Sequence, residues 1–221
     1  MLTEYKYRIT YKITGLLRFL SHKELMRMIG RVFRRANMPL AFSHGFNPHP
    51  LISFGPPRPV GTAGTAEQID VRLVEFLQPA ALLEIISKQF PKEMQLKDVA
   101  HISLQSKSIT ASIVEAEYEL DWPEELESPL EKIESFMSQN EAIHKRKTPK
   151  GIKSTDIRPG VFNLNWIAPK LKMKLALAPD KYVRPVDVLS KMTGWSDDEV
   201  KRIKITRTGF NQKQKNPDQT I

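Results

Sequence analysis

Residues 5–36 read YKYRITYKITGLLRFLSHKELMRMIGRVFRRA, and this stretch decides the fold of the N-terminal half. Residues 4–14 alternate between Tyr or Ile and mostly cationic side chains, which is the pattern of a strand with one buried face. Ser21 and Glu24 then have the spacing of a capping box, in which each side chain accepts from the other residue's backbone N–H. The apolar residues that follow at helical spacing are Leu25, Met28, Ile29, Val32, Phe33 and Ala36. The stretch predicts a strand and then a helix that ends before Pro39.

The rest of the first half supplies the remaining elements of a small α+β unit. Short apolar segments predict strands at 51–54, 68–74 and 94–103. A helix begins at Pro79 and is stopped by Pro91. The resulting order, β-α-β-β-α-β, is that of the ferredoxin-like fold.

The second half is predicted to repeat this order. Its expected strands lie at 110–122, 161–167, 171–178 and 201–207, and its expected helices at 126–139 and 186–192. The core stripe expected for the longer helix is Leu126, Leu130, Ile133 and Met137. We therefore expect an α+β protein of two tandem ferredoxin-like lobes with antiparallel sheets. The lobes are expected to span residues 1–105 and 106–209, before a disordered polar tail over 210–221.

The composition restricts the class of protein. The 221 residues include no cysteine, which excludes disulfides, thiolate zinc sites and Cys-bound iron–sulfur clusters. No run of about 18 apolar residues is present for a transmembrane helix, and the N-terminus lacks the apolar segment of a secretory signal. We expect a soluble cytoplasmic protein with no bound cofactor.

Charge is segregated along the chain, whose formal net charge is +9. Residues 1–60 carry 10 Lys or Arg and 2 Asp or Glu, residues 61–142 carry 6 and 16, and residues 143–221 carry 18 and 7. Two basic blocks around an acidic one indicate a field that attracts a polyanion to one side. The alternative is that folding intermixes the blocks and neutralises the pattern.

The first predicted helix separates apolar from cationic residues. The side opposite its apolar stripe carries Lys23, Arg27, Arg31, Arg34 and Arg35. The arginines have no acidic partner four residues later, so they repel one another unless an anion lies there. Phosphate suits that role because a guanidinium fork donates to two of its oxygens at once. The alternatives are a solvated face and a contact with the acidic middle segment.

Residues 42–61, FSHGFNPHPLISFGPPRPVG, hold five prolines and three phenylalanines but one charged residue. Asn47 and His49 each precede a proline, which holds both in extended geometry and lowers the entropy lost on binding a ligand. With His44 they are candidates for hydrogen bonds to base edges, and phenylalanine can stack on unpaired bases. The alternative is a stiff structural connection, which we favour for Phe54.

Metal binding and nucleophilic catalysis fit this segment less well. His22, His44 and His49 are of a metal-ligand type, but no Asp, Glu or Cys lies in the same stretch to complete a site, so we expect no metal. Adjacent pairs such as Ser43 and His44 seldom face one another as a nucleophile and its base must.

Residues 144–160, HKRKTPKGIKSTDIRPG, form a second basic segment with six Lys or Arg and a single carboxylate. A loop or hairpin of this kind can follow a phosphate backbone, and a merely solvated charge run is the alternative. For Asp156 we favour an ion pair that orients Arg158 or a nearby lysine over a catalytic role.

A predicted strand further on carries a row of lysines. Lys170, Lys172 and Lys174 alternate with apolar residues. This alternation indicates either a nucleic-acid platform or an ordinary exterior face.

Several of these residues form motifs. The segments LRFLSH (17–22), GFNPHP (45–50), SFGPP (53–57) and DIRP (156–159) together resemble a bacterial radical-SAM-associated domain of unknown function. That domain is often fused to the C-terminus of a radical SAM protein and tends to be encoded near ribosomal-protein and ribonuclease genes, which implies RNA- or ribosome-linked work. The positions that match its motifs are Arg18, His22, Gly45, Asn47, His49, Gly55, Asp156 and Arg158. Because this chain has no cysteine, a radical SAM cluster would belong to a partner protein.

Together these observations predict a protein that binds transfer or ribosomal RNA for modification or processing, with a radical SAM partner and no membrane. The predicted RNA-binding residues are Arg18, His22, Lys23, Arg27, Arg31, Arg34, Arg35, His44, Asn47, His49, Lys147, Lys150, Lys153 and Arg158. One alternative is an RNA-modifying or RNA-cleaving enzyme with His44, His49 or Asp156 as general acid or base. Another is a protein–protein adaptor for a radical SAM enzyme.

Overall fold

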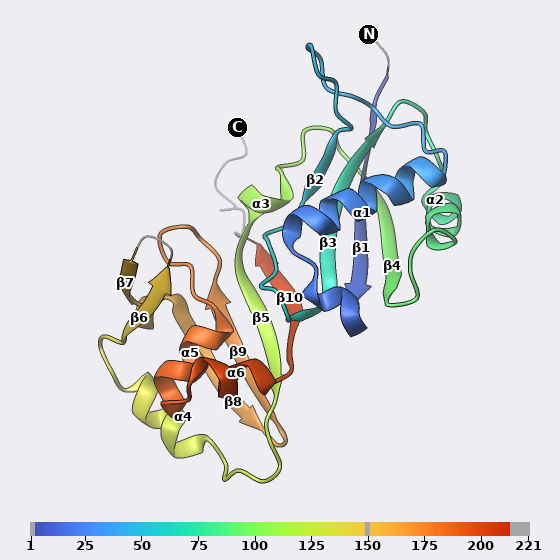
Figure 1. Cartoon of the computed structure of the whole chain (residues 1–221). Coiled ribbons are helices and arrows are strands. Elements are labelled where there is room, and N and C mark those ends of the chain that lie inside the picture. The colour runs from blue at the N-terminus through green and yellow to red at the C-terminus, as the bar shows by residue number, and fades with distance from the viewer. Residues whose placement is uncertain (1–2, 149–150, 213–221) are drawn as a thin grey trace, which may run out of the picture. The chain divides into compact units, whose positions relative to one another are not determined.

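The protein is a mixed α+β molecule whose sheets are mainly antiparallel, as a computed structural model of residues 3–148 and 151–212 describes (Figure 1). The chain divides into two compact units between Ser112 and Ile113. Among the described residues, no helix is long and apolar enough to cross a membrane.

The division falls a little later than the expected boundary at 105 and 106 because a short helix, α3 (Ile109–Ser112), belongs to the first unit. The Ile109 side chain is fully buried. The Thr110 hydroxyl donates a hydrogen bond of 3.1 Å to the Phe54 carbonyl. These contacts attach α3 to the first sheet.

The first unit has the β-α-β-β-α-β order that its sequence predicts. Its elements are β1 (Tyr5–Ile13), the 3₁₀ helix η1 (Gly15–Phe19), α1 (His22–Arg35), β2 (Ile52–Phe54), β3 (Ala63–Leu73), α2 (Pro79–Ser87), β4 (Met94–Ile102) and α3. β1 pairs with β4 on one edge and β3 on the other, and β2 pairs with β3. The strand order is therefore β4-β1-β3-β2, and all three pairings are antiparallel.

The buried face of this sheet is the one that the alternation in β1 predicts. Tyr7, Ile9, Tyr11 and Ile13 are at most 2% exposed. α1, which crosses the sheet in Figure 1, and α2 cover this face with Leu25, Ile29, Val32, Phe33, Leu82 and Ile86. Full burial of one such side chain stabilises the fold by about 1.5–3 kcal/mol. The other face of the sheet is left to the polar residues of the same strands.

Both ends of α1 are set by local chemistry. The Ser21 hydroxyl accepts from the Glu24 N–H at 3.3 Å, and the Glu24 carboxylate accepts from the Ser21 N–H at 2.8 Å. The hydrogen bonds from Ser21, with a smaller contribution from the charge of Arg27, lower the pKa of Glu24. After the last turn, Asn37 adopts a left-handed conformation with φ of 49°, which asparagine tolerates better than most residues.

The second unit contains a four-stranded antiparallel sheet and a separate hairpin. Its elements are β5 (Ile113–Asp121), α4 (Leu130–Met137), β6 (Ile143–Thr148), β7 (Gly151–Asp156), η2 (Arg158–Gly160), β8 (Val161–Ile167), β9 (Lys170–Ala176), α5 (Pro185–Thr193), α6 (Asp197–Arg202) and β10 (Ile205–Gln212). The strand order is β10-β5-β9-β8, and β6 and β7 form a two-stranded sheet of their own. In its core, the Trp122 ring stacks on Trp195 with centroids 5.1 Å apart.

The C-terminal elements differ from the prediction. The final strand is 205–212 rather than 201–207, because Ser196 and Glu199 form a second capping box that makes the residues after it helical. Phe210 and Asn211, expected in the tail, pair with Ala116 and Glu115 of β5. The rest of the tail, 213–221, lies outside the described residues.

The core stripe of α4 also differs from the prediction. Leu126 and Leu130 are 42% and 49% exposed, whereas Ile133 and Phe136 are buried. The helix begins only at Leu130, one residue after Pro129, so Leu126 precedes it. The apolar stripe therefore starts at Ile133.

Replacement of the α1 cap tests the assigned helix start. We expect Ser21→Ala to lower the free energy of unfolding by about 1 kcal/mol, because a backbone N–H loses its acceptor. Urea denaturation followed by circular dichroism measures the change. Ser135→Ala, at an exposed position within α4, is the matched control and should not destabilise. Equal stability of Ser21→Ala and the parent protein would contradict the capping box.

Candidate nucleic-acid interface

The outer face of α1 is cationic. Lys23, Arg27, Arg31 and Arg34 are exposed on the side opposite to the buried stripe. No residue within 3–148 or 151–212 forms an ion pair with any of these four. Arg35, also exposed, donates to the Gln89 carbonyl at 2.9 Å. Because like charges one turn apart repel, a bound anion would stabilise this face.

Residues 42–50 form a closed loop before β2. Phe42 and Pro50 make an isolated β-bridge, and the Ser43 N–H donates to the His49 carbonyl at 2.9 Å. The Ser43 hydroxyl oxygen accepts from the His49 N–H at 3.1 Å and lies 2.8 Å from the imidazole Nδ1. These bonds close the base of the loop and fix the imidazole of His49.

The tip of this loop projects polar and aromatic groups into solvent. His44, Phe46 and Asn47 are all exposed, and the Phe46 side chain is fully exposed. Gly45 has a φ of 123°, a conformation that residues with a Cβ rarely adopt. An exposed aromatic ring beside an amide and an imidazole is suited to stacking on an unpaired base and bonding to its edge.

Three of the motif residues make structural contacts within the first unit. The His22 ring packs edge-on against Phe54, with centroids 5.8 Å apart. The Arg18 guanidinium lies 4.8 Å from the Phe19 ring centre, and its buried Nε has no hydrogen-bond partner among the described residues. A Cβ on Gly55 would lie 3.2 Å from the Gln68 carbonyl oxygen, which is tighter than ordinary van der Waals contact. RNA binding by Arg18 and His22 stays a prediction.

The histidines of this segment have different surroundings. His22 packs on an aromatic ring, His44 is exposed at the loop tip, and His49 is bonded to Ser43. In the part of the chain that the structure describes, no group of three or more His, Asp or Glu side chains is arranged to hold a metal ion.

The β6–β7 hairpin is a second cationic surface, in the second unit. Arg146 lies directly opposite Lys153, and Lys145 is exposed beside them. Like charges opposite each other on paired strands are destabilising unless an anion offsets them. Lys150 and the side chain of Lys147 lie outside what the structure describes, so their predicted contacts stay predictions.

Asp156 and Arg158 bind main-chain groups. Asp156 Oδ1 accepts from the backbone N–H groups of Ala142 at 2.8 Å and Arg158 at 3.0 Å. The Arg158 guanidinium donates to the carbonyls of Met137 at 3.0 Å, Gln139 at 3.1 Å and Val161 at 2.9 Å. The two side chains thus tie the end of α4 to the start of β8. Within the described residues, the expected ion pair of Asp156 with Arg158 or a lysine is not found.

The lysine row on β9 is neutralised by β5. Lys170 lies 3.3 Å from an Asp121 oxygen and 3.4 Å from Glu119, and Lys174 lies 2.9 Å from Glu115. These carboxylates raise the pKa of Lys170 and Lys174. Cross-strand ion pairs favour the exterior-face interpretation of this row over a nucleic-acid platform.

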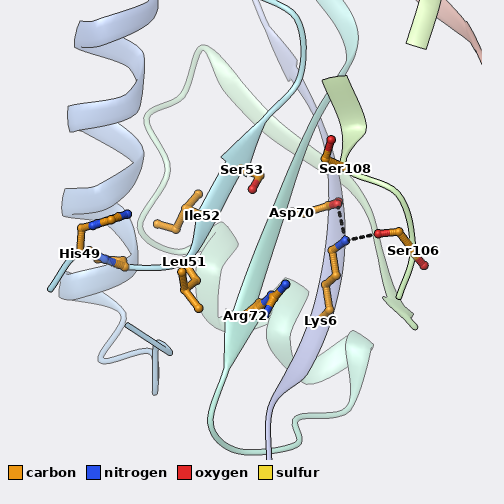
Figure 2. A pocket seen from close by; sticks show the side chains of 10 residues that line it. Lys6, His49, Leu51, Ile52, Ser53, Asp70, Arg72, Ser106 and Ser108 are labelled. Atoms are coloured by element: carbon orange, nitrogen blue, oxygen red, sulfur yellow. Dashed lines mark hydrogen bonds and ion pairs between the residues drawn. The ribbon is translucent and has the colours of Figure 1, made fainter. Parts of the chain in front are cut away.

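Sequence reasoning missed a polar pocket on the sheet face opposite to α1 and α2 (Figure 2). The pocket has a volume of about 320 Å³, and its lining includes Lys6, Asp70 and Arg72 from β1 and β3 and His49 from the loop. The sequence does contain a signal for this pocket, because these cationic and acidic residues alternate with the core residues of their strands and so lie on the opposite face of the sheet. The pairing of Lys6 with Arg72, however, depends on strand register, which one sequence does not reveal.

A family model described as an uncharacterized protein conserved in bacteria (DUF2344) matches residues 6–185. The chain belongs to this family. The match contains α1, the loop at 42–50 and the β6–β7 hairpin, and it ends before α6 and β10. No curated protein matches the chain.

The Arg158 contacts predict a structural role that stability measurements can test. Arg158→Ala leaves three carbonyls without a charged donor, so we expect a loss of about 2–4 kcal/mol in the free energy of unfolding. Arg202→Ala, on the exposed surface of α6, should change it by no more than about 0.5 kcal/mol. Guanidinium denaturation compares the two, and an Arg158→Ala protein as stable as the control would rule out the structural role.

Proposed function

We propose that this protein binds RNA through the outer face of α1 and the tip of the loop at 42–50. The observation that carries the proposal is the row of Lys23, Arg27, Arg31 and Arg34, exposed and without an ion pair in the described residues. Phosphates neutralise such a row, and the counterions that they release supply much of the binding free energy. Guanidinium groups also bind two phosphate oxygens at once.

The loop tip supplies contacts to bases. Phe46 is a stacking surface, and His44 and Asn47 beside it have donors and acceptors for base edges. The preferred substrate is thus RNA with unpaired bases next to a helical or looped backbone. The basic β6–β7 hairpin adds a phosphate-contact surface in the second unit.

We interpret both units as ferredoxin-like lobes. If each unit's strands are numbered in chain order and β6–β7 is set aside, β4-β1-β3-β2 and β10-β5-β9-β8 follow the same order: fourth, first, third, second. The hairpin is then an insertion into the second lobe. This interpretation is supported by the repeated β-α-β-β-α-β element order.

The protein's task in the cell is proposed to be modification or processing of transfer or ribosomal RNA with a radical SAM partner. The partner rests on the motif resemblance alone, and these 221 residues contain no cysteine that could ligate an iron–sulfur cluster. Binding is favoured over catalysis by the contacts of two of the three candidate acid–base groups. Asp156 accepts two backbone N–H groups, and His49 is bonded to Ser43 within its own loop.

Removal of two arginines tests the α1 face. The Arg27→Ala, Arg31→Ala double variant should weaken binding to a mixed-sequence oligoribonucleotide by about tenfold or more, because each charged hydrogen bond contributes about 1.5–3 kcal/mol. Fluorescence anisotropy measures the Kd. The matched control is Lys92→Ala, Lys97→Ala, which removes the same charge from exposed positions of the same unit. If both double variants bind equally, the α1 face is not the interface.

Replacement of the loop-tip aromatic tests base stacking. Phe46→Ala should reduce affinity for single-stranded RNA by about 1–3 kcal/mol, while Phe46→Trp retains it. The same substitution should leave fully paired RNA binding and the free energy of unfolding unchanged, because Phe46 is fully exposed. Equal affinity of the alanine and parent proteins for single strands would exclude stacking at this tip.

A further inference from the structure

The pocket on the opposite face of the first sheet carries a surplus of positive charge. Asp70 is 2% exposed and binds the Arg8 guanidinium with both carboxylate oxygens, at 2.8 and 3.0 Å. Lys6, 6% exposed, adds an ammonium group 3.3 Å from the same carboxylate. One buried carboxylate thus faces two buried or half-buried cations.

The second carboxylate nearby is too exposed to change this balance. Glu4 lies 3.1 Å from the guanidinium of Arg72, and the two side chains are 25% and 41% exposed. An ion pair this open to water contributes little. The cluster of three cations and two carboxylates therefore retains a net positive charge in a concave, partly desolvated site.

Several hydrogen-bond donors converge on the pocket without a full set of partners. The Lys6 ammonium uses two of its donors, on Asp70 and on the Ser106 carbonyl at 2.9 Å, and one remains. Figure 2 shows Arg72, Ser53 and Ser108 around the same hollow, with His49 at its margin. Among the described residues, the Ser53 hydroxyl has no hydrogen-bond partner.

The His49 imidazole can add a hydrogen-bond donor to these pocket groups. Its Nδ1 lies 2.8 Å from the Ser43 hydroxyl oxygen, which also accepts from the His49 backbone N–H. In the tautomer in which the Ser43 hydroxyl donates to Nδ1, the ring proton lies on Nε2 and is a donor. The histidine and two serines thus add three neutral donors to the cationic groups.

We propose that this pocket binds a phosphate monoester. A group with several anionic oxygens matches a set of ammonium, guanidinium, imidazole and hydroxyl donors better than a carboxylate with two oxygens. The volume of about 320 Å³ lies at the lower end of ligand pockets. It leaves room beside the phosphate for a sugar or base, against the apolar wall of Pro50, Leu51 and Ile52.

Two kinds of ligand carry a phosphate monoester: a free nucleoside monophosphate and the phosphorylated end of an RNA strand. The pocket is formed by residues other than the α1 cations, so the inference does not depend on the proposed function. Arg72 is the residue to change, because it is partly exposed and its loss leaves the buried Asp70 paired with Arg8 and Lys6.

Calorimetric titration with adenosine 5′-monophosphate and with adenosine tests the first source. Titration with one oligoribonucleotide carrying either a 5′-phosphate or a 5′-hydroxyl tests the second. In at least one of the two pairs, the phosphorylated probe should bind about tenfold tighter. Arg72→Gln should remove most of that difference, and Ser53→Ala part of it. Lys97→Gln, exposed on β4 and outside the pocket, should leave it unchanged.

A difference within the mononucleotide pair assigns the pocket to a free ligand, and a difference within the oligonucleotide pair assigns it to an RNA end. The proposal is overturned if neither phosphorylated probe binds tighter than its partner, or if Arg72→Gln acts no more strongly than Lys97→Gln. Failure of the α1 interface has another signature. The Arg27→Ala, Arg31→Ala variant would then bind each oligonucleotide with the affinity of the parent protein. This result does not depend on whether the 5′-phosphate and 5′-hydroxyl oligonucleotides differ in affinity.

Discussion

The packing of α1 against β1 and β3 is the constraint on which the surface of the first unit depends. Leu25, Ile29 and Val32 lie in the core, and a rotation of the helix that exposed them would bury the arginines of the opposite face. Burial of an unpaired ion costs several kcal/mol, so only one orientation is compatible with the sequence. The cationic row is therefore a direct consequence of the core, and the Ser21 cap fixes where the row begins.

The same strands separate apolar and charged residues on their two faces. In β1, Tyr7 and Ile9 join the core, whereas Lys6 and Arg8 meet Asp70 on the other side. The buried carboxylate is acceptable there because two cations hold it. Those cations also give the pocket its charge, so the interaction that makes a buried carboxylate tolerable also prepares a site for an anion.

Cationic side chains on different strand pairs have different roles because different residues lie opposite them on the neighbouring strand. Lys170 and Lys174 face carboxylates of β5, whereas Arg146 faces Lys153 across the β6–β7 hairpin. The first arrangement is satisfied within the chain. In the second, two like charges lie opposite each other while Asp180 and Asp187 line the same pocket, and a bound anion would lower the repulsion. This distinction separates an ordinary exterior face from a candidate phosphate surface.

Features that depend on neighbours in sequence were predictable, and features that depend on distant partners were not. The α1 cap and the buried parity of β1 follow from spacing within a few residues, and the structure has both. The role of Arg158 is set by carbonyls of Met137 and Gln139, about twenty residues away in the chain, and no local pattern marks it. The pocket and the carboxylate partners of Lys170 depend in the same way on strand register.

The central claim is that RNA occupies the outer face of α1 and the tip of the loop at 42–50. Ultraviolet crosslinking in cells, followed by mass spectrometry of the peptides that carry nucleotides, tests it most directly. The account predicts adducts on Phe46 or its immediate neighbours and on peptides from residues 22–35. Recovery of the protein without crosslinked RNA, or with adducts confined to the β9 face, would contradict it.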